Sequence, residues 1–347
     1  FRRLRDEDPV HLNELPETGR YWSLTRYDDI KAVDSNHELF SSAHGITLGL
    51  PIGTPLPEGA LGIQMFIAMD PPKHDVQRKA VNPIVSGQNL AGYEELIRSR
   101  TCEVLDSLPR GEAFDWVDKV SIELTSRMLA TLFGWPQERR RMLTYWSDVS
   151  TSDPELPGSP GKEERQGILL GMLQEFTMLW NERVNAEPTG DLVSMLAHNP
   201  ATRNMPPMEF MGNLVLLIVG GNDTTRNTMS GIVHALDRFP DQRAILEADP
   251  ALIPNAAQEC LRYITPLAHM RRTATRDTEL AGVPIREDDK VVIFYASANF
   301  DDEEFTDPLH FDITRPVKPP QVSFGAKGPH HCLGAPLARM EIRVLLE

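Results

Sequence analysis

A glycine-rich segment near the end of the chain presents one cysteine just before a predicted helix. The segment is Phe324–Gly334, and it places Cys332 close to a helix whose first turn contains Pro336. Proline suits that position because its missing N–H costs no helical hydrogen bond. The free N–H groups of a helix N-terminus stabilise negative charge and favour a thiolate. The pattern predicts a thiolate ligand for a soft or borderline metal ion. The alternative is a buried cysteine that packs as a small hydrophobic side chain.

A second pattern interrupts a long hydrophobic segment that we predict to be a buried helix over 208–237. Gly220–Thr225 contains two glycines, Asp223 and the hydroxyls of Thr224 and Thr225. Polar groups are costly to bury without partners, and each mid-helix glycine costs roughly 1 kcal/mol relative to alanine. One interpretation is a groove where a carboxylate and a hydroxyl, bonded back to a carbonyl one turn earlier, transfer protons. A close helix–helix contact through the glycines explains the pattern equally well.

Two weaker patterns pair an acid or a histidine with an arginine on one helix face. Glu259 and Arg262 are three positions apart, and His74 and Arg78 are four positions apart. Taken alone, the first is better explained as a surface ion pair and the second as a solvated face.

Further candidates lie in the strand region and before the cysteine. Arg271 and Arg272 are adjacent in a predicted strand, so at most one of them faces a given site. His330 and His331 precede Cys332 and suggest a zinc site, but no fourth ligand lies at a suitable spacing.

The remaining sequence supplies the elements that would position these residues. An apolar segment rich in Gly and Pro over 45–62 is typical of a binding loop. Hydrophobic periodicity predicts helices over about 28–33 (opened by an Asp28 cap), 90–105, 116–133, 163–185, 208–237 and 253–263, and strands over 21–25, 269–275, 278–280, 283–285 and 291–295. A mainly helical fold with a small antiparallel β portion follows, and no linker divides 1–347 into separate domains.

The composition of the chain argues against several classes of function. The chain has 347 residues, 41% of them hydrophobic, and a net charge of -15, which argues against binding nucleic acid or anionic lipid. Cys102, Cys260 and Cys332 are too scattered for a disulfide framework and fit a reducing cytoplasm. No apolar run reaches the ~18 residues of a membrane span, and no signal peptide is visible. Because the chain begins without Met and ends inside a helical pattern, we expect a piece of a longer protein, missing both ends.

In order and combination, these segments resemble the soluble bacterial cytochrome P-450 superfamily. The resemblance covers essentially the whole chain. The family's motifs are matched by Phe324, Gly328, His330, Cys332, Leu333-Gly334 and Leu337-Ala338-Arg339 in the cysteine loop, by Gly220–Thr225 in the oxygen-activating helix, by Glu259 and Arg262, and by His74 and Arg78. One departure is that Phe324 lies eight positions before Cys332, one more than the common pattern. The longer loop is similar to that of some actinobacterial steroid-oxidising members.

The resemblance implies a prism-like helical domain with a β subdomain, which holds haem b between the central helix and the helix after the cysteine loop. Cys332 would be the thiolate ligand of the iron, and Glu259 with Arg262 a buried structural pair. Thr224 would hydrogen-bond the bound oxygen and Asp223 would relay protons from solvent. The other implied haem contacts are His74, Arg78, Arg272 and His330 at the propionates, Gly221 in the central helix, and Phe324 near the thiolate.

Further stretches resemble the bacterial alkane and fatty-acid terminal (omega) hydroxylases. They lie at 67–75, 114–118, 179–183, 216–227 and 266–273. The resemblance implies a monooxygenase that hydroxylates the end of an apolar chain. A steroid or terpenoid hydroxylase of the same fold, and a haem-binding carrier or sensor without turnover, are the alternatives. The expected apolar pocket residues are Ile46, Leu48, Leu50, Met65, Phe66, Leu217, Val219, Leu267 and Met270.

The chain contains no flavin or iron–sulfur motif, so its electrons would come from NAD(P)H through separate proteins. The resemblance implies a ferredoxin and its reductase, with O2 as co-substrate. We expect an acidic ferredoxin to dock on a basic patch formed by Lys73, Arg78, Lys79, Arg339 and Arg343. Neither nucleic acid nor stable membrane insertion is expected.

Overall fold

A single long helix forms the axis of the helical part. The computed structural model describes residues 1–55, 61–153 and 156–347. Helix α9 (Pro207–Arg238) is continuous for 32 residues and carries buried Leu214 and Ile218 in its first half. The predicted central helix is therefore confirmed. Its glycine-containing stretch Gly220–Thr225 does not break the helix, because the surrounding hydrophobic segment packs strongly enough to offset the low helix propensity of glycine.

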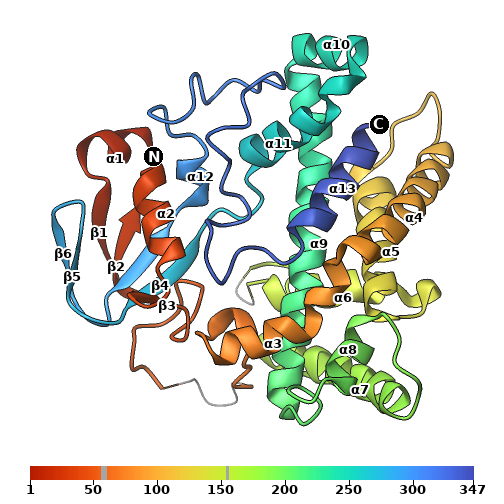
Figure 1. The fold of residues 1–347 in the computed structure, drawn as a ribbon, viewed down its shortest axis with the longest axis horizontal. Helices are drawn as coiled ribbons and strands as arrows, with labels where there is room; N and C mark the ends of the chain where they lie inside the picture. The colour runs from red at the N-terminus through yellow and green to blue at the C-terminus, as the bar shows by residue number, and fades with distance from the viewer. Residues whose placement is uncertain (56–60, 154–155) are drawn as a thin grey trace.

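Other helices surround α9, and most of them contribute to the largest hydrophobic core (Figure 1). Phe176 of this core stacks on Trp135, with ring centroids 5.0 Å apart. The surrounding helices are α3 (Lys73–Val81), α4 (Gly87–Asp106), α5 (Ile122–Phe133), which a π-helical segment over Val117–Ser121 precedes, α6 (Arg141–Thr151), α7 (Lys162–Val184), α8 (Leu192–His198), α10 (Pro240–Ala248), α11 (Ile253–Ile264) and α13 (Ala335–Leu346). Short 3-10 turns lie at Phe66–Ala68, Asn82–Val85, Gln137–Arg139 and Pro250–Leu252.

A small sheet lies on the opposite side of the molecule, with α1 (Arg2–Glu7), α2 (Tyr27–Ser35) and α12 (Tyr295–Ala298) (Figure 1). Its strands, in spatial order, are β1 (Val10–Leu15), β2 (Gly19–Leu24), β7 (Lys290–Ile293), β4 (Met270–Ala274) and β3 (Phe40–Ser41). Strands β5 (Thr278–Leu280) and β6 (Val283–Ile285) form a separate hairpin.

The sheet differs from the sequence prediction in direction and extent. Strand β1 was not predicted, and β2 pairs with β7 in parallel, with Trp22 opposite Val291, whereas the other pairs are antiparallel. No turn joins β2 to β7, so local turn signals could not set their direction. The predicted Asp28 cap of α2 is also wrong. Arg26 is the N-cap, and Asp28 lies in the first turn, where its charge still complements the helix dipole.

The cysteine loop passes between the two parts. In Figure 1 it is the dark blue segment that precedes α13, between the sheet and α9. Among the helices of the described residues, none is both long and apolar enough to cross a bilayer.

Candidate functional site

The backbone of the cysteine loop is held tightly at two glycines. The Cys332 N–H donates to the Phe324 carbonyl at 2.9 Å, which closes the loop on itself. Gly325 has a φ of 79°, which favours glycine. A Cβ at Gly328 would lie 2.7 Å from the carbonyl oxygen of Asp34, so only glycine fits there. Pro336 occupies the first turn of α13, as the sequence predicts.

Cys332 is partly buried, and the groups around it shift the pKa of its thiol in opposite directions. Burial raises the pKa of its thiol, while the N–H groups of Gly334 and Ala335 and the charges of Arg78 and Arg339 act in the lowering direction. The helix-end stabilisation that the sequence suggests is present, but burial outweighs it. A thiol of this kind becomes a stable anion when a metal cation bonds to its sulfur. The Arg339 guanidinium lies 4.5 Å from the centroid of the Phe324 ring, which fixes that ring beside the loop.

Two histidines from distant segments meet beside the loop. The ring centroids of His74, on α3, and His330 are 4.3 Å apart. The Nε2 atom of His74 and both ring nitrogens of His330 are buried and have no hydrogen-bond partner among the described residues. Burial, with the nearby charges of Arg272, His74 and Arg78, lowers the pKa of His330 to about 3. Buried polar nitrogens without a partner indicate that a hydrogen-bonding group is missing beside them.

The two predicted arginines converge on the same place. Both Arg78 and Arg272 act on the charge of His330, so α3, β4 and the loop contribute to one cationic cluster. Arg78 donates to the carbonyls of Pro329 at 2.9 Å and His331 at 2.5 Å. Arg272 donates to Asp34 at 2.6 Å. These contacts place both arginines beside His330, and Arg78 lies close enough to Cys332 to act on its thiol.

Helix α9 presents an open face at Gly220. Leu216, Gly220 and Thr224 recur at every fourth position and so lie along one helix face. A Cβ at Gly220 would meet no atom within 4 Å, whereas one at Gly221 would lie 2.8 Å from Leu129 Cδ2 of α5. Gly221, predicted as a haem contact, thus has the helix-packing role that the sequence left open, and Gly220 is the glycine beside open space. The Thr224 hydroxyl donates to the Gly220 carbonyl at 3.1 Å, the back-bond that the sequence suggests.

Asp223 points towards α6 and has a charged partner. Arg226 bridges it to Asp148, at 2.7 Å and 2.9 Å respectively, and Ser147 donates to it at 3.3 Å. Burial is the main cause that raises the pKa of Asp223, and Arg226 opposes it. Sequence reasoning missed Arg226, although its spacing of three residues from Asp223 is a detectable signal.

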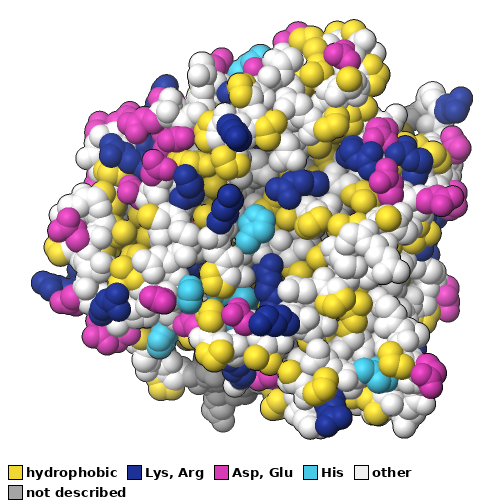
Figure 2. Space-filling view, viewed as in Figure 1, with side chains coloured by type: hydrophobic (Ala, Val, Ile, Leu, Met, Phe, Trp, Pro, Cys, Tyr) yellow, Lys and Arg dark blue, Asp and Glu magenta, His cyan; other side chains and the backbone are white. Residues whose placement is uncertain are grey.

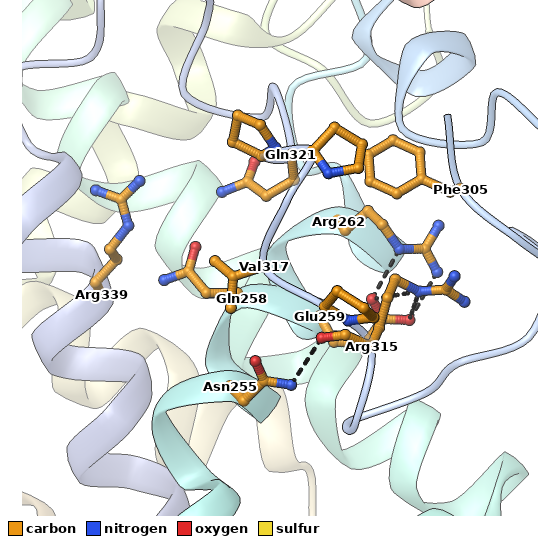
Figure 3. Close-up of a pocket in the computed structure, with 12 residues that line it drawn as sticks. Asn255, Gln258, Glu259, Arg262, Phe305, Arg315, Val317, Gln321 and Arg339 are labelled. Carbon is orange, nitrogen blue, oxygen red and sulfur yellow. Dashed lines mark hydrogen bonds and ion pairs between the residues drawn. The ribbon is translucent and has the colours of Figure 1, made fainter. Parts of the chain in front are cut away.

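The Glu259–Arg262 pair is buried, as the family resemblance implies. Arg262 Nη2 lies 2.7 Å from Glu259 Oε1, and Arg315 Nε adds a second contact to Glu259 at 3.2 Å (Figure 3). Arg262 also donates to the carbonyls of Asn299 and Pro308. The arrangement connects α11 to the irregular segment before the cysteine loop. No local signal in the sequence identified Arg315.

Two further cations that the sequence left unassigned hold the apolar loop near its start. Arg271 projects away from Arg272, as adjacent strand residues must, and its guanidinium donates to the carbonyls of His44, Thr47 and Leu48. The Lys290 ammonium donates to the carbonyls of Thr18, Leu48, Gly49 and Leu50. The described part of the predicted binding loop is thus tied to strands β4 and β7.

Comparisons with known proteins agree with this geometry. The cytochrome P450 family model matches residues 251–347. Linalool 8-monooxygenase from Pseudomonas putida is 38% identical over 358 residues, which cover 100% of this chain and 86% of that protein. Methyl-branched lipid omega-hydroxylase from Mycobacterium tuberculosis is 32% identical, with 100% and 82% covered. The solved structure of cytochrome P450-153 from Novosphingobium aromaticivorans is 50% identical, covers 99% and 86% of the two chains, and has a TM-score of 0.90.

A glycine-rich cysteine loop beside a long central helix is the arrangement expected of a haem-thiolate protein. The chain belongs to the cytochrome P450 family, as the relative that is 38% identical over its full length shows. Haem is the cofactor of this family, and the residues present fit it. The buried nitrogens of His74 and His330 that lack a partner among the described residues would be available to hydrogen-bond the haem propionates. The enzyme is therefore a cytochrome P450 monooxygenase.

Proposed function

We propose that this monooxygenase hydroxylates the terminal carbon of an apolar chain, such as an alkane or a fatty acid. The observation that carries the proposal is the open face of α9, where Leu216 and Gly220 lie in line with the Thr224 hydroxyl and present no charge. An apolar wall with a few polar groups suits a hydrophobic substrate. The lipid relative named an omega-hydroxylase supports attack at a chain end.

Each side chain of the site has a proposed role. The Cys332 sulfur would ligate the haem iron, and His74, Arg78, Arg272 and His330 would orient the propionates through charge-assisted hydrogen bonds. Haem, when bound, supplies the activation of O2, and a thiolate ligand favours cleavage of the O–O bond. Phe324, fixed by Arg339, would shield the sulfur from water.

Proton delivery would depend on Thr224 and Asp223. Because Thr224 donates its own proton to Gly220, its hydroxyl oxygen is free to accept a hydrogen bond from a group in the open space. Asp223 is partly exposed and lies beside the partly exposed Arg226, so it has access to solvent from the α6 side. Exchange of Arg226 between Asp148 and Asp223 would release the Asp223 carboxylate to carry a proton towards Thr224.

Electrons would come from NAD(P)H through a ferredoxin reductase and a ferredoxin. Two residues of the predicted docking patch already have acidic partners within the chain. Lys73 pairs with Glu209, and Arg343 pairs with Glu94. Lys79 and Lys327 are exposed and form no ion pair with other described residues, so they are the stronger docking candidates. Figure 2 shows lysine and arginine side chains (dark blue) across the middle of the face that carries the cysteine loop.

A terpenoid alcohol is the second candidate substrate, because the relative that acts on linalool is 38% identical to this chain. Substrate-induced spin-shift titrations with octane, a fatty acid and linalool, followed by product identification, distinguish the two. We expect octane or the fatty acid to give the larger shift and a terminal alcohol as product. Turnover of linalool alone, or hydroxylation at internal carbons, would contradict the proposal.

A further inference from the structure

A buried aspartate that belongs to none of the matched motifs joins the cysteine loop to the cationic cluster. Asp34 lies in the last turn of α2, and the residue is only 6% exposed. Its Oδ1 accepts from the Arg272 guanidinium at 2.6 Å. Its Oδ2 accepts from the Ala326 N–H at 2.6 Å and from the Tyr295 hydroxyl at 3.1 Å. One carboxylate therefore contacts β4, α12 and the cysteine loop together.

The glycines of the loop are shaped around the same residue. A Cβ at Gly325 would lie 3.0 Å from Asp34 Oδ2, and one at Gly328 would lie 2.7 Å from the Asp34 carbonyl oxygen. Ala326 and Lys327 separate these two glycines, within the loop whose spacing from Phe324 to Cys332 is one residue longer than the common family pattern. The backbone of the longer loop is thus anchored where Ala326 bonds to Asp34.

We propose that Asp34 is a positioning residue for the haem site, which holds the lengthened cysteine loop and the propionate-binding Arg272 in a fixed relation. It would act through its contacts with Arg272 and with the loop. The proposal rests on the assignment of Cys332 as the iron ligand and of Arg272 as a propionate ligand. The carboxylate also places a negative charge beside the cationic cluster, which disfavours addition of an electron to a nearby haem.

An asparagine at position 34 cannot make all of the hydrogen bonds that Asp34 makes. Both oxygens of Asp34 face donors, and Arg272 and the Ala326 N–H cannot turn into acceptors. In Asp34→Asn the amide N–H2 must face one of them, so either the arginine or the loop loses its anchor. Removal of the charge also makes reduction of the haem more favourable.

Asp301→Asn is the matched control. Asp301 is 3% exposed, accepts the Tyr27 N–H at the start of α2 at 2.9 Å, and lies 3.7 Å from Arg5. It is thus a buried carboxylate that pairs with an arginine of α1 and with a backbone N–H of α2, the helix that carries Asp34, and no contact joins it to the cysteine loop among the described residues. Loss of stability alone would affect both variants, whereas loss of positioning would affect only Asp34→Asn.

The experiment measures the reduced, CO-bound spectrum, the haem midpoint potential and the rate of haem transfer to apomyoglobin in the purified holoenzyme. We expect Asp34→Asn to lose part of the red-shifted thiolate band, to shift the potential in the positive direction and to release haem several-fold faster than Asp301→Asn. Identical spectra, potentials and haem-release rates in the two variants would overturn the proposal. Absence of the thiolate band in the unmodified protein would instead refute the assignment of Cys332.

Tyr295→Phe is a milder variant that tests the proposal if Asp34→Asn does not fold. Tyr295→Phe removes one donor to Asp34 Oδ2 and leaves the Arg272 and Ala326 contacts in place. We expect faster haem release than in the unmodified protein, with the thiolate band retained. An unchanged release rate in Tyr295→Phe would count against the proposal.

Discussion

At the scale of single residues, the site separates groups that face the open side of α9 from groups that face its neighbours. Thr224 and Gly220 lie on the open face, while Gly221 packs on Leu129 and Asp223 points towards α6. Two adjacent motif residues, Asp223 and Thr224, thus belong to different surroundings. A proton that reaches Asp223 from solvent must pass to the other side of the helix to reach Thr224. Mutation of Thr224 tests this transfer directly.

Thr224→Ala should uncouple electron consumption from product formation. Without the hydroxyl, proton delivery fails, and product formed per NAD(P)H should fall about tenfold or more, since positioned proton transfer contributes typically 10²–10⁴-fold. The measurement compares hydrogen peroxide with alcohol product in a reconstituted reaction.

Thr228→Ala provides the control for Thr224→Ala. Thr228 donates to the Thr224 carbonyl at 2.8 Å, the same back-bond one turn later, but is buried. Coupling should be unchanged in this variant. Equal uncoupling in the two variants, or normal coupling in Thr224→Ala, would rule out the assigned role.

At the scale of elements, periodicity located the longest helices but gave no range for α6, α8 and α10, and it could not identify which elements pack together. The predicted helix over 208–237 differs from α9 by one residue at each end, and the one over 253–263 differs from α11 by one residue at its C-terminal end. Contacts such as Asp34 with Arg272, or Glu259 with Arg315, join positions far apart in the chain, and no local spacing encodes them. The motifs predicted which segments form the site, because each motif is local. They did not predict what holds the segments together.

The two glycines of α9 should respond differently to alanine. Gly220→Ala adds a methyl group to open space, so the helix should gain about 0.5–1 kcal/mol of stability, while substrate-induced spin shifts weaken because the open face is narrowed. Gly221→Ala adds a methyl group against Leu129 Cδ2 and should gain less stability or lose some. Urea unfolding measures the stability of the two variants, and spin-shift titration measures their substrate binding. Stronger substrate binding in Gly220→Ala would contradict the assignment of the open face.

A buried glutamate in α13 should make stability depend on pH. Burial raises the pKa of Glu341 to about 8 from an ordinary value of 4.5. Between these values the folded state holds a proton that the unfolded state has lost, so this residue lowers stability as pH rises, by about 1.4 kcal/mol per unit at most.

Glu341→Gln removes this titration. Its free energy of unfolding, relative to the unmodified protein, should increase from pH 5 to about pH 8 and then level off. The exposed Glu247, which pairs with Arg243 across one turn, provides the control variant Glu247→Gln. A pH-independent difference between Glu341→Gln and the unmodified protein would show that Glu341 is ionised in the folded state.

At the scale of the whole molecule, the cysteine loop, α3 and β4 meet beside α9 although they lie far apart in the chain. The loop brings Cys332 and His330, α3 brings His74 and Arg78, and β4 brings Arg272. The fold class and this convergence were expected from the family resemblance that the motifs carry. The parallel pairing of β2 with β7 and the anchoring of the loop by Asp34 required the structure.

The central claim is that Cys332 ligates haem iron as a thiolate. The absorption spectrum of the reduced, CO-bound protein tests it most directly, because a thiolate ligand shifts the Soret band to longer wavelength than a neutral ligand does. The account predicts the red-shifted band in the unmodified protein and its loss in Cys332→Ser. A band at the position of a neutral-ligand adduct in the unmodified protein, or a red-shifted band that survives Cys332→Ser, would contradict the account.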